Sequence, residues 1–306
     1  MRNVAQLVSE RLLPQVRRPG QYVGLEVNAR CPDPAGAEVT VALAFPDAYA
    51  VGIGHLGSQV LYHLLNDLPG VACDRAYCPR PDAEEVMRRE GVPLFGWESR
   101  CALRDFDVLG FSLAYEMCVT NVLTMLDLAG VPLRAEARGP GDPIVVGGDA
   151  LADSPEAVAE FFDLLLPGDG EEPLRALVEL LRRMKPSRPG REELLLAAAK
   201  SIPSAYAPRF YRPQYGADGT LQVPRRLRDD VPETIARAHV ARLDESPPVR
   251  RPLVPLAEAV HDRAAVEVMR GCPNSCRFCQ AGATRLPVRT RDMEAVVAAA
   301  HEALDA

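Results

Sequence analysis

The sequence has almost no lysine and no excess of positive charge. Lys185 and Lys200 are the only lysines, so arginine supplies nearly all of the positive charge, and the formal net charge is -7. General binding of polyanions requires a concentrated basic surface, because affinity comes from the release of counterions. The composition therefore excludes a generic nucleic-acid-coating protein and leaves only a local basic patch open.

Long apolar runs are also missing. Residues Met1 to Gln21 contain no apolar core of a signal peptide, and no stretch of about 18 uncharged apolar residues occurs. We therefore expect a cytoplasmic protein with no membrane partner. In a reducing compartment, the eight cysteines are expected to be free thiols or metal ligands rather than disulfides.

The length of 306 residues and the hydrophobic content of 47% suit a globular protein of two domains. The pattern predicts a helical or extended lead-in (1–37), an α/β domain (38–184), a connector with a hairpin and linker (185–257), and the start of a second domain (258–306).

Within the α/β domain, short β-branched or apolar runs alternate with amphipathic helical stretches, which is typical of parallel βα units. The predicted strands are Val39 to Phe45, Val71 to Tyr77, Val108 to Leu113, Ile144 to Val146 and Phe161 to Leu166. Helical stripes start at Leu56, Val119 and Leu174. Ligands of such open sheets bind at the carboxyl ends of the strands, where this sequence places glycines. Those glycines either admit a ligand close to the backbone or only form tight turns.

After a Pro-interrupted helical connector, residues Tyr206 to Leu227 predict a hairpin around Gly216 and Gly219. Arginines and tyrosines mix in it, a combination that suits stacking and neutralisation of RNA. A solvated hairpin is the interpretation that we favour. Arg228 to Pro255, rich in proline and charge, predicts an extended linker.

A short strand is predicted from Val266, Val268 and Met269, and it leads directly into a loop with three cysteines. Cys272, Cys276 and Cys279 have the spacing C-x3-C-x2-C. Cubane iron-sulfur clusters usually take four thiolates. Three thiolates hold three irons and leave the fourth iron open to another ligand, so we predict that these cysteines bind a 4Fe-4S cluster.

Other interpretations of this loop are weaker. A structural zinc site needs a fourth ligand, and His261 and His301 are not at a usual zinc-finger spacing. A redox pair made of Cys276 and Cys279 would leave Cys272 without a role. Chance clustering of three cysteines in one glycine-flanked loop is less expected still. The remaining cysteines, Cys31, Cys73, Cys78, Cys101 and Cys118, are scattered and are predicted to be structural.

The cysteine loop Arg270 to Gly282 resembles that of the radical SAM superfamily, in particular of its branch with a cobalamin-binding domain. Further segments that resemble this branch are Phe45 to Gly57, Asp107 to Leu113, Val145 to Gly148 and Gly168 to Glu171. The resemblance covers nearly the whole chain. It implies a flavodoxin-like cobalamin-binding domain followed by the first βα unit of a radical SAM partial TIM barrel.

The resemblance also implies cofactors and chemistry. S-adenosylmethionine (SAM) would bind the open iron and be cleaved reductively to a 5'-deoxyadenosyl radical, with an electron donor such as flavodoxin or ferredoxin. Phe278 would contact the cluster or adenine. Residues expected around the tail of cobalamin are Ser112, Gly147, Gly148, Gly168, Asp169, Gly170 and Glu171. The sequence identifies no catalytic side chain.

Two departures from the family pattern matter. The motif D-x-H-x-x-G is absent around His55, so we expect no histidine ligand to cobalt from it. The stretch from Gln280 to Ala306 has no glycine-rich SAM-binding segment and is too short for a partial barrel. We therefore expect a truncated barrel, or one that a separate chain completes, and an exposed apolar stripe on the helix Met293 to Leu304.

The substrate stays open between RNA, another protein and a small metabolite. The alternative function is a non-catalytic protein that binds a corrinoid or nucleotide as a carrier or sensor, or one that binds zinc.

Overall fold

The computed structural model describes residues 1–30, 33–261, 263–274 and 276–306. Cys31, predicted to be structural, lies outside the described residues. At the centre is a five-stranded parallel sheet of order β2-β1-β3-β4-β5, the order of flavodoxin-like doubly wound sheets. Its strands are β1 (Val39–Phe45), β2 (Val71–Tyr77), β3 (Val108–Ser112), β4 (Ile144–Gly148) and β5 (Leu164–Leu166). The predicted α/β class is confirmed.

The strand predictions differ in quality along the chain. Strands β1 and β2 begin and end at the predicted residues, and every residue in both is buried. The prediction of a strand from Phe161 is wrong for its first three residues, because Ala159–Phe161 forms a 3-10 turn and β5 starts only at Leu164.

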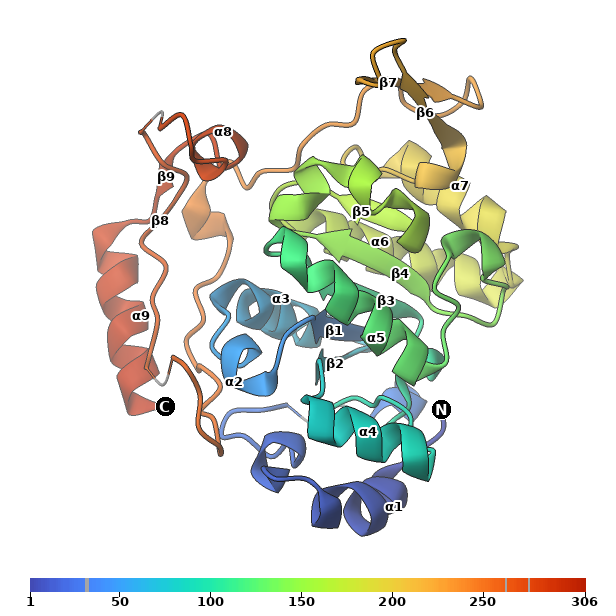
Figure 1. Cartoon of the computed structure of the whole chain (residues 1–306). Helices are drawn as coiled ribbons and strands as arrows, with labels where there is room; N and C mark the ends of the chain where they lie inside the picture. Colours follow the sequence, from blue (N-terminus) through green and yellow to red (C-terminus); the bar gives the residue numbers. More distant parts are fainter. Residues whose placement is uncertain (31–32, 262, 275) are drawn as a thin grey trace.

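Helices cover both faces of the sheet (Figure 1). They are α2 (Tyr49–Gly52), α3 (Leu56–Asn66), α4 (Pro81–Glu90), α5 (Val119–Ala129), α6 (Glu171–Met184) and α7 (Arg191–Ser201). Helix α3 contacts α6, and α4 contacts α5 on the other face. Local sequence sets the ends: α4 starts with proline, and α4 and α5 end at Gly91 and Gly130, both left-handed.

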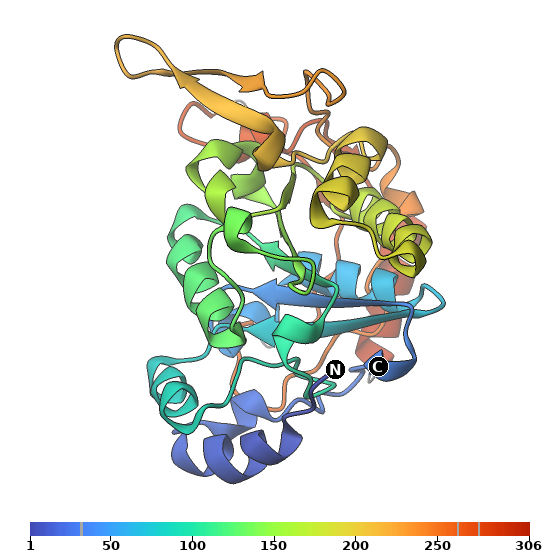
Figure 2. The same cartoon turned by 90° about the vertical axis from the view of Figure 1, so that its right-hand side faces the viewer.

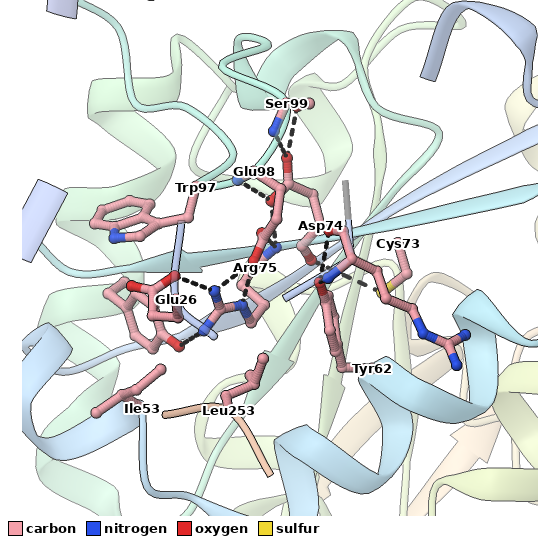
Figure 3. A network of polar contacts seen from close by, with 12 residues as sticks. Glu26, Ile53, Tyr62, Cys73, Asp74, Arg75, Trp97, Glu98, Ser99 and Leu253 are labelled. Atoms are coloured by element: carbon pink, nitrogen blue, oxygen red, sulfur yellow. Dashed lines mark hydrogen bonds and ion pairs between the residues drawn. The ribbon is translucent and has the colours of Figure 1, made fainter. Parts of the chain in front are cut away.

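The N-terminal lead-in (1–37) contributes buried side chains to the core of the sheet domain. After α1 (Ala5–Leu7), the helical turn Val8–Leu12 packs on α4, and Val4, Val8 and Leu12 are buried. Further on, Glu26 reaches Arg75 on the edge strand β2, as Figure 3 shows. The lead-in therefore closes the β2 edge of the sheet.

The predicted hairpin is confirmed as β6 (Tyr211–Tyr215) and β7 (Leu221–Arg226), which pair antiparallel. It projects from the body in both Figure 1 and Figure 2. The segment after it, Arg228 to Pro255, has no α-helix or strand, as expected of a linker, but it is packed on the sheet domain. Val240, Ser246 and Leu253 are buried, because the linker runs back over the sheet domain and hydrogen-bonds to it.

The C-terminal segment consists of β8 (Met269–Arg270), α8 (Ala281–Thr284), β9 (Arg289–Thr290) and α9 (Met293–Asp305). The predicted strand from Val266 is reduced to two residues, because only Met269 and Arg270 find ladder partners, and these lie antiparallel on β9. Helix α9 buries Ala299 and Ala303.

On the other side of α9, the expected exposed apolar stripe is present. Met293 is 73% exposed, Val297 48% and Leu304 77%. None of the helices in the described part of the chain combines the length and apolarity that crossing a membrane requires.

Candidate functional site

A cavity of about 500 Å³ lies at the carboxyl ends of β1, β3, β4 and β5. Its apolar wall includes Leu43, Phe111, Val146 and Leu166. The cavity spans the junction of β1 and β3, where the strand order reverses, which is the place at which open α/β sheets bind ligands. A volume of this size suits a drug-sized molecule or the tail of a larger cofactor.

Most residues predicted to bind the cofactor meet at this cavity. Ser112, Gly148 and all four residues of Gly168 to Glu171 line it. The prediction for Gly147 is not supported by its position, since Gly147 is not part of the lining. A Cβ on Gly147 would lie 2.7 Å from the side chains of Leu113 and Leu165. The packing of the core, rather than access to the cavity, therefore requires glycine there.

Gly168 is required for a different contact, because the linker backbone lies directly against it. Its φ is +101°, and a Cβ there would lie 2.0 Å from the carbonyl oxygen of Ala238. Asp169 then accepts a hydrogen bond of 2.8 Å from the Val240 amide. Only glycine allows this approach, so the fixed path of the linker depends on it.

His55 caps helix α3 and faces the cavity. Its Nδ1 accepts a hydrogen bond of 3.1 Å from the Ser58 amide and lies 2.8 Å from Ser58 Oγ, which is 3.2 Å from Ser112 Oγ. Its Nε2 lies 3.8 Å from Asp149. Burial lowers the pKa of His55 and outweighs the opposing effect of Asp149; Arg285 lowers it further. The imidazole is therefore neutral near pH 7, with its Nδ1 occupied by the cap.

The segment that carries the cysteines covers the open side of the cavity. The sequence did not predict this contact. Glu267, Arg270, Gly271, Arg285 and Arg289 all line the cavity. Arg285 forms an ion pair with Asp149, and Arg270 forms one of 2.6 Å with Glu171. The strand ends and the cysteine segment thus enclose one space.

The cysteine loop is closed by glycine at both ends. Gly271 has φ +89°, and a Cβ on it would lie 2.7 Å from the carbonyl oxygen of Arg285. A Cβ on Gly282 would lie 2.8 Å from that of Asn274. Within the loop, the Cys279 amide donates to the Cys276 carbonyl at 3.0 Å. Backbone contacts that only glycine permits therefore hold the loop compact.

The loop cysteines differ from the other described cysteines in exposure. Cys276 is exposed and Cys272 and Cys279 are half-buried, whereas Cys73, Cys78, Cys101 and Cys118 are buried. Burial raises the pKa of the Cys78 thiol to about 12 and raises that of Cys73 as well. Buried thiols that stay protonated do not act as metal ligands, so the structural role predicted for these four is supported.

The three loop thiols fit the donor chemistry of an iron-sulfur cluster: all are sulfur, all are reachable, and they lie in one short loop. Among the described residues, no group of three or more His, Cys, Asp or Glu side chains is already gathered as a metal site. Phe278, predicted to contact the cluster or adenine, is 93% exposed.

The fold and site define an α/β protein with a strand-end cavity beneath a segment with three cysteines. Residues 57–208, just under half of the chain, match the family model described as radical SAM proteins, N-terminal. No curated protein and no solved structure matches the chain.

The family match supports a radical SAM protein, and radical SAM proteins in general use a 4Fe-4S cluster and SAM. The match ends at residue 208, before the cysteine loop.

Proposed function

We propose that this protein is a radical SAM enzyme whose cluster is held by Cys272, Cys276 and Cys279, and whose strand-end cavity takes the tail of cobalamin. The observation that carries the proposal is the enclosure of one cavity by the predicted cofactor loops and the cysteine segment. When bound, a three-thiolate cluster supplies the electron that cleaves SAM to methionine and a 5'-deoxyadenosyl radical.

Each part of the chain has a defined task in this proposal. Cys272, Cys276 and Cys279 would hold three irons of the cluster, and the fourth iron would be open to the amino and carboxylate groups of SAM. Ser112, Gly148 and Gly170 offer hydroxyl and backbone surface to the cofactor tail, and the apolar wall excludes water from it. The neutral His55 is a wall residue of the cavity, and its Nδ1 is held by the cap of α3.

Anaerobic reconstitution with iron and sulfide tests the proposal. We expect the visible absorption band of a cubane cluster, a change in the spectrum when SAM is added, and formation of 5'-deoxyadenosine after reduction. Cys101→Ser provides a matched control, since it removes a buried thiol away from the loop. Absence of the band in the wild-type chain would contradict the assignment.

A non-catalytic role is the second candidate, because the cavity at the strand ends would by itself serve a protein that carries or senses a corrinoid or nucleotide. Binding of hydroxocobalamin without any SAM-dependent spectral change would favour this carrier or sensor function. Zinc in place of iron would favour the zinc-binding alternative.

A further inference from the structure

Two acidic side chains that follow β5, Asp169 and Glu171, form ion pairs with arginines of the cysteine segment. Arg270 lies 2.6 Å from Glu171 and 3.4 Å from Asp169, and Arg289 forms an ion pair with Asp169. Asp169 and Glu171 are among the residues that the family resemblance associates with cobalamin. In this structure their carboxylates face the cysteine segment.

These ion pairs are buried, and the linker donates further hydrogen bonds to both carboxylates. Asp169, Glu171 and Arg289 are each less than a tenth exposed. The linker contributes the Val240 amide to Asp169 and the Ser246 hydroxyl to Glu171, both at 2.8 Å. Burial raises the pKa of Asp169, but the hydrogen bonds from Val240 and Arg289 outweigh it and leave that pKa lowered. Asp169 is therefore ionised at neutral pH.

The β8–β9 hairpin needs these carboxylates. It has two residue pairs, and one of them places Arg270 directly opposite Arg289. A two-stranded hairpin is marginal on its own, and like charges opposite each other destabilise it. Asp169 lies within ion-pair distance of both guanidiniums and neutralises this repulsion. Glu267, in the same segment, also pairs with Arg270, whereas Arg289 meets the carboxylate of Asp169, so docking on the end of β5 stabilises the hairpin.

Arg270 is also directly connected to the cysteine loop, because only Gly271 separates it from Cys272. We propose that Arg270 and Arg289 are positioning residues, which hold the cysteine loop at the cavity through Asp169 and Glu171. The proposal depends on the geometry of the chain alone and does not require that a cluster or cobalamin binds. It assigns Asp169 and Glu171 to the cysteine loop rather than to the cobalamin tail.

Residue-resolved alkylation of the cofactor-free chain, followed by mass spectrometry, tests the proposal. Labelling of a half-buried thiol follows the population of the locally opened state. In Arg270→Gln we expect Cys272 to react about tenfold faster, equivalent to about 1.4 kcal/mol easier opening. Cys276 should change little because it is already exposed, and Cys73 should stay protected because it lies in the core.

The controls separate positioning from a general loss of stability. Arg250→Gln breaks an exposed ion pair with Glu302 and should leave Cys272 unchanged. Arg270→Lys keeps the positive charge and should restore part of the protection. The double variant Arg270→Gln, Glu171→Gln should increase the labelling of Cys272 by less than the two single effects added together, because both substitutions break the same ion pair. Unchanged labelling of Cys272 in Arg270→Gln, or an equal increase at Cys73, overturns the proposal.

Discussion

Arg75 Nη2 lies 2.7 Å from Glu26 Oε2 inside the protein, and Arg75 Nε donates to Glu98 at 2.6 Å (Figure 3). The side chains of Arg75, Glu26 and Glu98 are each at most 5% exposed. The pairing joins the lead-in to the edge strand β2 and to the loop before β3. It closes the edge of the sheet farthest from β5.

Removal of one partner from this network should destabilise the fold strongly. For Glu26→Gln we expect a loss of about 2 kcal/mol in the free energy of unfolding, because the buried Arg75 loses a charged hydrogen-bond partner while Glu98 still pairs with it. Urea denaturation measures the loss. Asp67→Asn, which breaks the exposed pair with Arg30, is the control and should cost less than about 1 kcal/mol. Equal losses in both variants would contradict a special role of burial.

Glycine should be required at Gly168 and not at Gly139. Gly168→Ala forces a Cβ toward the backbone of Ala238 at a positive φ, whereas a Cβ on Gly139 meets nothing within 4 Å. We expect Gly168→Ala to lose about 1 to 3 kcal/mol from backbone strain alone, and Gly139→Ala to be near neutral. Thermal denaturation of both variants checks the difference, and equal melting temperatures would refute it.

Stability should fall in acid because of two half-buried histidines, His55 and His63. Burial lowers the pKa of His55 and of His63 below the ordinary value of 6.5. Above pH 6.5 both are neutral in the folded and unfolded chain, and the full stability is present. Below it, the unfolded chain takes up protons first, so stability declines until pH reaches the folded pKa values. Calorimetry between pH 8 and pH 5 should show a shallower decline for His55→Gln; an identical slope would argue against it.

A larger side chain at Gly148, on β4, should fill part of the cavity and block ligand binding. Gly148 lines the cavity, and a Cβ there meets only the Leu166 carbonyl oxygen at 3.9 Å, so Gly148→Val is expected to fold. If the cavity takes the cobalamin tail, this variant should bind hydroxocobalamin at least about tenfold more weakly, as a side chain would occupy the space. Gly139→Val is the surface control. Equal affinities measured by absorbance titration would place the cofactor elsewhere.

The sequence predicts the elements with strong local signals. Periodicity and β-branched residues define β1 and β2 to the residue, and the strand-end glycines locate the cavity. It does not show that Gly147 is required for core packing. A glycine that packs against Leu113 and a glycine that contacts a ligand cannot be told apart from a single sequence. It also misses the pairing of Arg270 with Glu171, since these residues lie about a hundred positions apart and nothing local connects them. The burial of the linker was missed for the same reason, because it depends on hydrogen bonds that the Val240 and Leu253 amides donate to the distant Asp169 and Gln59.

The metal content of the reconstituted chain tests the central claim most directly. After anaerobic reconstitution, the wild type should hold about four irons per chain. Alanine at Cys272, Cys276 or Cys279 should each remove most of this iron, and Cys101→Ser should retain it. Iron that persists in all three alanine variants, or zinc in place of iron in the purified protein, would contradict the account.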